Sequence, residues 1–244
     1  MIYFVIPCYN EEKNIAPMLR DTHVFLEKHE LPHTLMVVND GSLDGTAERV
    51  LEIQKEGRVG CELISYTPNR GVAGAFREGF HHALARAGTS DLIVTIEADR
   101  TGDLNILGQM LDQIAAGADV SLASCYAPGG GIEGTNAFRR FLSVAANGLI
   151  RFFFGMHHIH TYSSFYRVYR PNVLKAVQDS YGDFYEESGF GCVVELLVRI
   201  YRMKFKIEEI PMVLRGQMRT GKSKMRIGKT VLGYLRVIQR NSFR

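Results

Sequence analysis

Residues 92–105 read LIVTIEADRTGDLN and combine an apolar run with a polar end. The run from Leu92 to Ile96 is continuously apolar or β-branched, a pattern typical of a strand buried on both faces of a sheet. It stops abruptly in acidic and hydroxyl side chains. The stretch therefore predicts a central strand whose end holds carboxylates rigidly at a crevice.

The carboxylates at this strand end have the spacing of a metal site. Glu97 and Asp99 lie two residues apart, so in extended backbone their side chains share one side of the strand. Thr101 and Asp103 continue the alternation, and such oxygen ligands suit Mg²⁺ or Mn²⁺. The alternative is that Asp99 and Asp103 cap a helix beginning near Leu104.

Outward from this stretch, strands alternate with helices through the first half of the chain. Buried-strand patterns occupy residues 2–6, 35–38, 61–66, 92–96 and 120–124. Asn10 is predicted to cap the first helix. The alternation predicts an α/β fold, a mostly parallel sheet with helices on both faces, and a ligand crevice at the carboxyl ends of the strands.

The second half has a different pattern. We expect helices at about 137–154, 171–177 and 189–203, and strands at 164–169 and 205–212. Glu195 lies among apolar neighbours in the third of these helices, so it is either paired or functional. The amphipathic pattern from Ile227 to Ile238 places Val231, Tyr234 and Leu235 on one apolar face.

The composition is that of an ordinary globular protein, with 46% hydrophobic and 23% charged residues among 244. Residues 1–6 are too short and lack the basic start of a signal peptide, so we expect them to form the first strand, and the longest apolar stretch, 141–155, falls short of a bilayer span. The cysteines lie far apart without a CxxC pair, which favours a reduced, cytosolic setting: Cys8, Cys61, Cys125 and Cys192.

Positive charge is concentrated at the end of the chain. From residue 215 onward there are nine basic residues and no acidic one, whereas the remainder carries 20 basic and 26 acidic residues. A basic block of this kind suits phosphates, an anionic membrane surface or nucleic acid.

Six motifs occur in an order that is typical of one enzyme family. They are IPCYNEE at 6–12, VNDGSLDGT at 38–46, NRG at 69–71, EAD at 97–99, FYRVYR at 165–170 and GKSK at 221–224. Their ordered combination resembles the family 2 glycosyltransferases, and within them the branch of dolichol-phosphate mannose synthase and its bacterial polyprenyl-phosphate relatives. The resemblance extends from residue 2 to about residue 226.

This resemblance implies a GT-A fold and transfer of a hexose, with inversion, from a GDP- or UDP-sugar to a polyprenyl phosphate. It implies that the nucleotide is bound by Pro7, Tyr9, Glu11, Asp40 and Ala98. It implies that Mg²⁺ or Mn²⁺ is bound by Glu97, Asp99 and Thr101. Asp99, Arg219 and Lys224 are the implied catalytic residues, and Arg139, Arg140 and Ser143 the implied acceptor contacts.

The chain departs from this branch at four positions. The branch usually has Asp where this chain has Glu97, and Gln where it has Thr101. It has Arg at the position of Cys125 and Asp at the position of Thr161. The departure at Cys125 concerns the phosphate acceptor more than the donor.

Two alternatives keep the donor but change the function. A hydroxyl acceptor on a saccharide or other polar molecule would need a catalytic base, for which Asp183, Glu186 and Glu187 are the candidates. The other alternative is a catalytically silent protein that binds nucleotide sugars or uses its tail on nucleic acid. We expect the histidines at 157, 158 and 160 to be surface or acceptor-side residues rather than a zinc site.

These observations predict a GT-A domain at residues 1–226 and a basic amphipathic helix at 227–244 that associates with a membrane. The partners we expect are the nucleotide sugar, the polyprenyl phosphate and an anionic membrane surface, with no nucleic acid. The predicted location is the cytoplasm, peripherally on the cytoplasmic face of a membrane.

Overall fold

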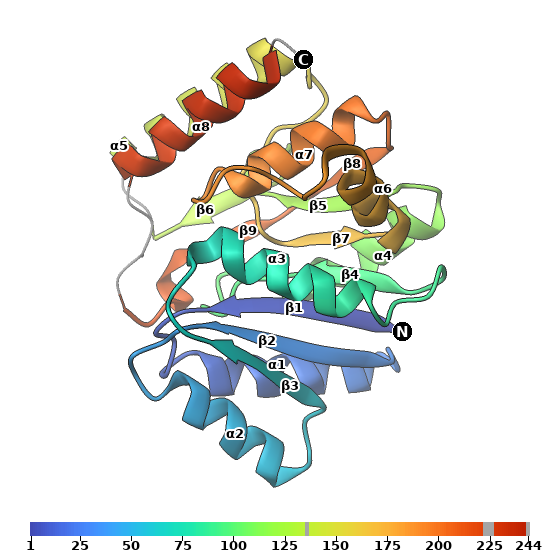
Figure 1. Cartoon of the computed structure of the whole chain (residues 1–244), viewed down its shortest axis with the longest axis vertical. Coiled ribbons are helices and arrows are strands. Elements are labelled where there is room, and N and C mark those ends of the chain that lie inside the picture. The colour runs from blue at the N-terminus through green and yellow to red at the C-terminus, as the bar shows by residue number, and fades with distance from the viewer. Residues whose placement is uncertain (135–136, 222–226, 243–244) are drawn as a thin grey trace.

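The computed structural model of the chain describes residues 1–134, 137–221 and 227–242. Seven strands form the main sheet in the order β3-β2-β1-β4-β7-β5-β8 (Figure 1). They are β1 (Ile2–Cys8), β2 (His33–Asp40), β3 (Cys61–Tyr66), β4 (Leu92–Thr95), β5 (Val120–Ser124), β7 (Arg167–Tyr169) and β8 (Ile207–Pro211). A separate pair consists of β6 (Gly131–Glu133) and β9 (Val213–Arg215).

The helices follow the predicted alternation. They are α1 (Ile15–Lys28), α2 (Thr46–Glu56), α3 (Gly71–Leu84), α4 (Leu107–Ala115), α5 (Ala137–Phe154), α6 (Pro171–Tyr181), α7 (Cys192–Arg202) and α8 (Ile227–Ser242). Short 3-10 turns occur at η1 (Leu104–Ile106) and η2 (Gly216–Met218). The prediction of an α/β fold with a mostly parallel sheet is confirmed.

The direction of the strands places their polar ends together. β1 is parallel to β2 and β4, and its residues Cys8 and Val5 pair with Asn39 and Thr95. The residues that follow these strands therefore meet at one edge of the sheet. β7 is the exception within the main sheet, because it lies antiparallel between β4 and β5.

Two hydrophobic cores cover the two faces of the sheet. Successive residues of a strand point to opposite faces. In β1, Val5 packs in the core that includes α3, α6 and α7, whereas Phe4 and Ile6 pack in the core that includes α1, α2 and α4. Gly79 of α3 lies so close to the sheet that a Cβ there would be 2.3 Å from a methyl group of Val5.

The first helix begins later than predicted, and the Asn10 cap is wrong. α1 starts at Ile15 with Asn14 in the cap position, and Asn10 has a φ of 53°. The Asn10 side chain instead accepts a hydrogen bond of 2.8 Å from the backbone N–H of Leu43. Two of the motif loops, 6–12 and 38–46, are thus joined to each other, and this contact takes the side chain away from the helix.

The last helix lies alongside α5 at one end of the molecule (Figure 1) and also packs on α7. Its buried face includes Val237, Ile238 and Asn241, whereas Val231 and Leu235 are exposed, so the protein covers only part of the predicted apolar face. Arg236 forms an ion pair of 3.0 Å with Glu187, whose side chain is almost fully buried. Among the described residues, none of the helices has the length and apolar character needed to span a bilayer.

Candidate active site

A cavity of about 790 Å³ opens where the strand ends meet. Every residue predicted for the nucleotide and the metal, except Thr101, is among the residues that line it: Pro7, Tyr9, Glu11, Asp40, Glu97, Ala98 and Asp99. Arg219 and Ser143 line it as well. The fold therefore brings together side chains that lie far apart in the sequence.

Both oxygens of the Asp99 carboxylate accept hydrogen bonds. Its Oδ1 accepts hydrogen bonds from the hydroxyl of Thr101 at 2.7 Å and from the backbone N–H of Thr101 at 3.1 Å. Its Oδ2 accepts a hydrogen bond of 2.6 Å from Nε of Arg219. Because both oxygens have fixed partners, the carboxylate presents one defined orientation to the cavity.

Glu97 lies beside Asp99, and the negative charge of its carboxylate is poorly compensated. Burial, followed by the negative charge of Asp99, raises the pKa of Glu97 to about 8, although the positive charge of Arg219 opposes the shift. The Thr101 hydroxyl lies 3.5 Å from Oε2 of Glu97. Two adjacent carboxyl groups with excess negative charge are an arrangement that a divalent cation stabilises.

The donor set at the end of β4 fits a hard cation. Glu97 and Asp99 both line the cavity and offer only oxygen ligands, as Mg²⁺ and Mn²⁺ prefer. Thr101, the third predicted ligand, is fully buried and is not among the residues that line the cavity. Its hydroxyl donates to Asp99, so its contact in the structure is that of a residue that positions the carboxylate.

Helix capping was the alternative to metal binding for both Asp99 and Asp103. In the structure, Asp103 has the capping role. It precedes η1 and accepts a hydrogen bond of 3.1 Å from the backbone N–H of Asn105. It also pairs with Arg215 at 3.2 Å. The capping interpretation is confirmed for Asp103, whereas the hydrogen-bond partners of Asp99 are Thr101 and Arg219.

Hydrogen bonds to two other parts of the chain hold the segment that carries Arg219. Asn14 donates to the carbonyl oxygen of Thr220 at 3.0 Å and accepts from its backbone N–H at 3.2 Å. The N–H of Arg215 donates to the carbonyl oxygen of Thr101 at 3.1 Å. Sequence reasoning missed Asn14, and the only available signal was an asparagine close to the 6–12 motif.

Asp40 lies in the part of the cavity for which nucleotide binding was predicted. This buried carboxylate accepts hydrogen bonds from the Arg70 backbone N–H at 2.7 Å and the Asn69 side-chain amide at 2.8 Å. Burial raises its pKa. Asp40 thereby connects the 38–46 and 69–71 motifs.

Two of the four positions that depart from the resembled branch, Cys125 and Thr161, line the same cavity as Glu97. Cys125 lines the cavity, and burial raises the pKa of its thiol to about 11, so it contributes no charge at neutral pH. Thr161 is buried and contacts the Ser124 hydroxyl at 2.8 Å. The Glu209 carboxylate accepts the Thr161 backbone N–H at 2.9 Å, which fixes this loop.

The candidate bases do not line the cavity. Asp183 accepts two hydrogen bonds from Arg77. Glu186 and Glu187 form ion pairs with the arginines at 199, 236 and 240. Glu195 accepts the backbone N–H groups of residues 186 and 187 and pairs with the residue 199 guanidinium, so the paired interpretation of Glu195 is confirmed.

The remaining predicted residues divide into described and undescribed ones. Lys224 lies outside the described residues, and so do the side chains of Arg139 and Arg140. His160 pairs with Glu209 at 2.8 Å. Within the described parts of the chain, His157, His158 and His160 are not among the side chains close enough to share a metal.

An apolar part of the cavity was not predicted. Phe165, Phe190 and Tyr234 line it together with Ser143 of α5. Tyr234 belongs to α8, so the cavity extends from the carboxylates to the α5–α8 pair. Phe165 and Tyr234 belong to patterns noted in the sequence, but those patterns do not distinguish an aromatic residue that lines a cavity from one in the core.

The comparisons with known proteins agree with this arrangement. A family model described as "Glycosyl transferase family 2" matches residues 3–178. The chain is 31% identical over 222 residues to a polyprenol monophosphomannose synthase of Mycolicibacterium smegmatis, covering 91% of this chain and 79% of that protein. It is 27% identical to a dolichol-phosphate mannosyltransferase of Pyrococcus furiosus, covering 97% of this chain and 62% of that protein. It is 26% identical to an undecaprenyl-phosphate mannosyltransferase of Micrococcus luteus, covering 95% of this chain and 91% of that protein.

Solved structures share the fold. A glucosyl-3-phosphoglycerate synthase from Mycobacterium tuberculosis, crystallised with Mn²⁺, uridine diphosphate and phosphoglyceric acid, has a TM-score of 0.68 at 16% identity, covering 98% of this chain and 76% of that one. A mannosyl-3-phosphoglycerate synthase from Rubrobacter xylanophilus has a TM-score of 0.69 at 15% identity, covering 98% and 73%. The predicted GT-A fold and the resemblance to the family are confirmed.

Proposed function

Since this chain belongs to glycosyl transferase family 2 and is a glycosyltransferase, we propose that it transfers a hexose from a nucleotide-diphosphate sugar to a polyprenyl phosphate, with inversion at the anomeric carbon. The observation that carries the proposal is the Glu97–Asp99 pair beside Arg219 in a cavity lined by the nucleotide motifs. The acceptor is proposed from the names of the three curated relatives, each of which acts on a polyprenyl-type lipid phosphate.

The proposed binding of the nucleotide-sugar donor rests on charge. When the glycosidic bond breaks, negative charge builds on the departing diphosphate, and preorganised cations stabilise it. Glu97 and Asp99 would hold Mg²⁺ or Mn²⁺, which supplies Lewis-acid stabilisation of that charge. Arg219 lies next to the same carboxylates and would contact the diphosphate directly. Pro7, Tyr9, Glu11, Asp40 and Ala98 line the part of the cavity proposed for a GDP or UDP base and ribose.

The proposed binding of the polyprenyl phosphate acceptor rests on the lining of the cavity. Its wall changes from carboxylates near β4 to Phe165, Phe190 and Tyr234 near the α5–α8 pair. A lipid phosphate entering from this side would place its phosphate toward Arg219 and its chain along aromatic side chains. Because a phosphate oxygen is deprotonated at neutral pH, it needs orientation rather than a base. Ser143 lines this wall, and Arg139, Arg140 and Lys224 remain proposed contacts.

The α5–α8 pair is proposed to dock on the membrane that supplies the acceptor. Apolar side chains are exposed on both helices: Val144, Leu149, Phe152 and Phe153 on α5, and Val231, Leu232 and Leu235 on α8. Phe152 is 79% exposed, which is unfavourable in water for a side chain of this size. From residue 215 onward the chain has nine basic residues and no acidic one, which suits anionic lipid on the cytoplasmic face.

Purified protein with Mn²⁺ and a radiolabelled nucleotide sugar tests the proposal. We expect label to enter the lipid fraction only when polyprenyl phosphate is added. Asp99→Asn should abolish transfer because it weakens both the metal site and the Arg219 contact. Asp103→Asn is the matched control, since Asp103 caps η1 and does not line the cavity. Transfer to hydroxyl acceptors alone would overturn the acceptor assignment.

A further inference from the structure

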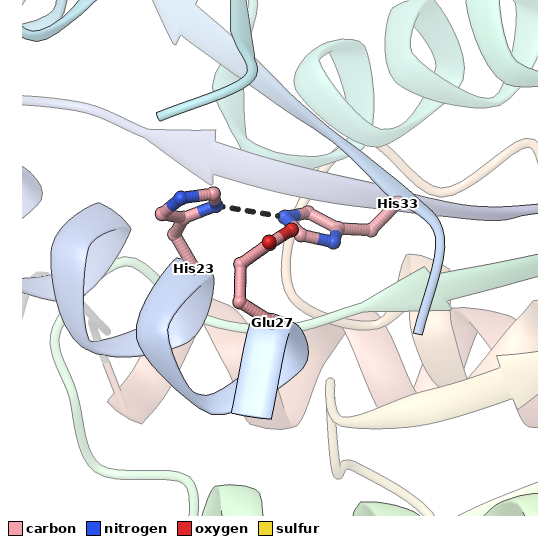
Figure 2. A group of neighbouring side chains, drawn as sticks. All are labelled: His23, Glu27 and His33. Atoms are coloured by element: carbon pink, nitrogen blue, oxygen red, sulfur yellow. Dashed lines mark hydrogen bonds between the residues drawn. The ribbon is translucent and has the colours of Figure 1, made fainter. Parts of the chain in front are cut away.

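Three side chains far from the cavity lie together in the geometry of a metal site. His23 and Glu27 are four residues apart on α1, so they lie on one face of the helix. His33 is the first residue of β2, and the three side chains converge between the two elements (Figure 2). One nitrogen or carboxylate oxygen from each of the three residues lies within 4.8 Å of those of the other two.

The two imidazoles have the spacing of ligands on one ion. Nδ1 of His23 lies 3.1 Å from Nε2 of His33 (Figure 2). Two nitrogens bound to one tetrahedral Zn²⁺ at about 2.0–2.1 Å are about 3.3 Å apart. The two nitrogens therefore already have almost the separation that an ion requires, and each ring has to turn until its lone pair points at the ion. Glu27 is exposed, so its carboxylate can reach the same point by side-chain rotation.

The tautomer of His33 is fixed by the backbone. Its Nδ1 lies 2.8 Å from the carbonyl oxygen of Leu31, which can only accept a hydrogen bond, so Nδ1 carries the proton. Nε2 is left with a lone pair that points at His23. A hydrogen bond from the second ring nitrogen to a carbonyl is the usual way in which a metal-binding histidine is oriented. Binding would require His23 to move its own proton from Nδ1 to Nε2.

We propose that His23, Glu27 and His33 form a Zn²⁺ site with water in the fourth position, which fastens α1 to the start of β2. Two imidazoles and one carboxylate are ligands that zinc accepts in proteins. Asp40, at the other end of the same strand, lines the cavity about 23 Å away at the rise of an extended strand. The site therefore acts on stability and stands independently of the proposed glycosyl transfer.

Calorimetric titration of the full chain with zinc chloride alone tests the site. The background variant Glu97→Gln/Asp99→Asn removes the carboxylates of the cavity, so that zinc bound there is not counted. We expect one zinc ion per chain and a thermal unfolding midpoint that rises with zinc concentration. His23→Ala and His33→Ala should each weaken binding by at least the roughly 10- to 100-fold seen when an outer-shell partner is removed.

Controls separate ligation from folding. Glu27→Gln changes an exposed side chain and should weaken zinc binding without changing the circular dichroism spectrum. His157→Ala removes an exposed histidine elsewhere and should leave zinc binding unchanged. Absence of zinc binding, or equal affinity in the background and the His33→Ala variant, would overturn the proposal and leave a simple hydrogen bond between the two histidines.

Discussion

Replacing Arg219 by alanine should strengthen metal binding while it weakens catalysis. Arg219 donates a 2.6 Å hydrogen bond to Oδ2 of Asp99, and a second guanidinium nitrogen contacts the same oxygen. A cation bound by Asp99 competes with this arginine for the carboxylate. The variant removes the competitor and a nearby positive charge, and both changes favour the cation.

The magnitude follows from the burial of the pair. The side chains of Arg219 and Asp99 are 27% and 10% exposed, so solvent screens their contact only partly. Hydrogen bonds to charged groups contribute about 1.5–3 kcal/mol. At about 1.4 kcal/mol per factor of ten, Arg219→Ala should raise Mn²⁺ affinity by about 10- to 100-fold. Turnover should fall by about 10²–10³-fold, as when one donor to developing charge is lost.

The assay is a Mn²⁺ titration without nucleotide, in which electron paramagnetic resonance reports free Mn²⁺. Arg219→Lys keeps the charge but loses the forked contact, so an intermediate affinity is expected. Arg215→Ala is the matched control, because Arg215 lies in the same segment and pairs with Asp103. Unchanged or weaker Mn²⁺ binding in Arg219→Ala would refute the reasoning that arginine and metal share Asp99.

Three further changes test packing, the buried ion pair and the membrane surface. Gly79→Ala should lower the free energy of unfolding by about 1–3 kcal/mol in urea denaturation, because its new Cβ would lie 2.3 Å from a methyl group of the sheet. Gly148→Ala, a helical position with open space around it, should not lower it, and equal losses would contradict this packing. Glu195→Ala should cost about 3–5 kcal/mol in the same assay, since it removes the buried carboxylate that pairs with the Arg199 guanidinium and leaves two backbone N–H groups without their acceptor; a loss below about 1 kcal/mol would argue against the pair. Leu232→Glu/Leu235→Glu should reduce flotation with anionic vesicles while transfer to a detergent-solubilised acceptor persists, and undiminished flotation would count against α8 as the docking surface.

The sheet and its crevice were predictable because the relevant signals are local. A continuous apolar run such as Leu92 to Ile96 identifies a doubly covered strand, and polar residues after it identify the strand end. Because parallel strands end at one edge, Asp40 and Asp99 could be expected to meet there. The motif resemblance added the family, which the comparisons confirm.

Several assignments needed the tertiary structure. The sequence left Asp99 and Asp103 with the same two alternatives, and only their neighbours distinguish them: Asp103 caps η1, whereas Asp99 contacts Arg219. Contacts with α5 and α7 cover part of the apolar face predicted for the last helix and leave Val231 and Leu235 exposed, which residue spacing alone could not show.

The α/β class, the strand ends and the carboxylate pair could be predicted from residue patterns alone, because each pattern is local. The contacts of Arg219 with Asp99 across 120 positions, and of Asn14 with Thr220 across 206, became known from the folded arrangement. Such contacts depend on how whole elements pack, and residue spacing carries no record of that packing. The physical reason is that local periodicity reports which face of an element is buried, but not which distant element covers it.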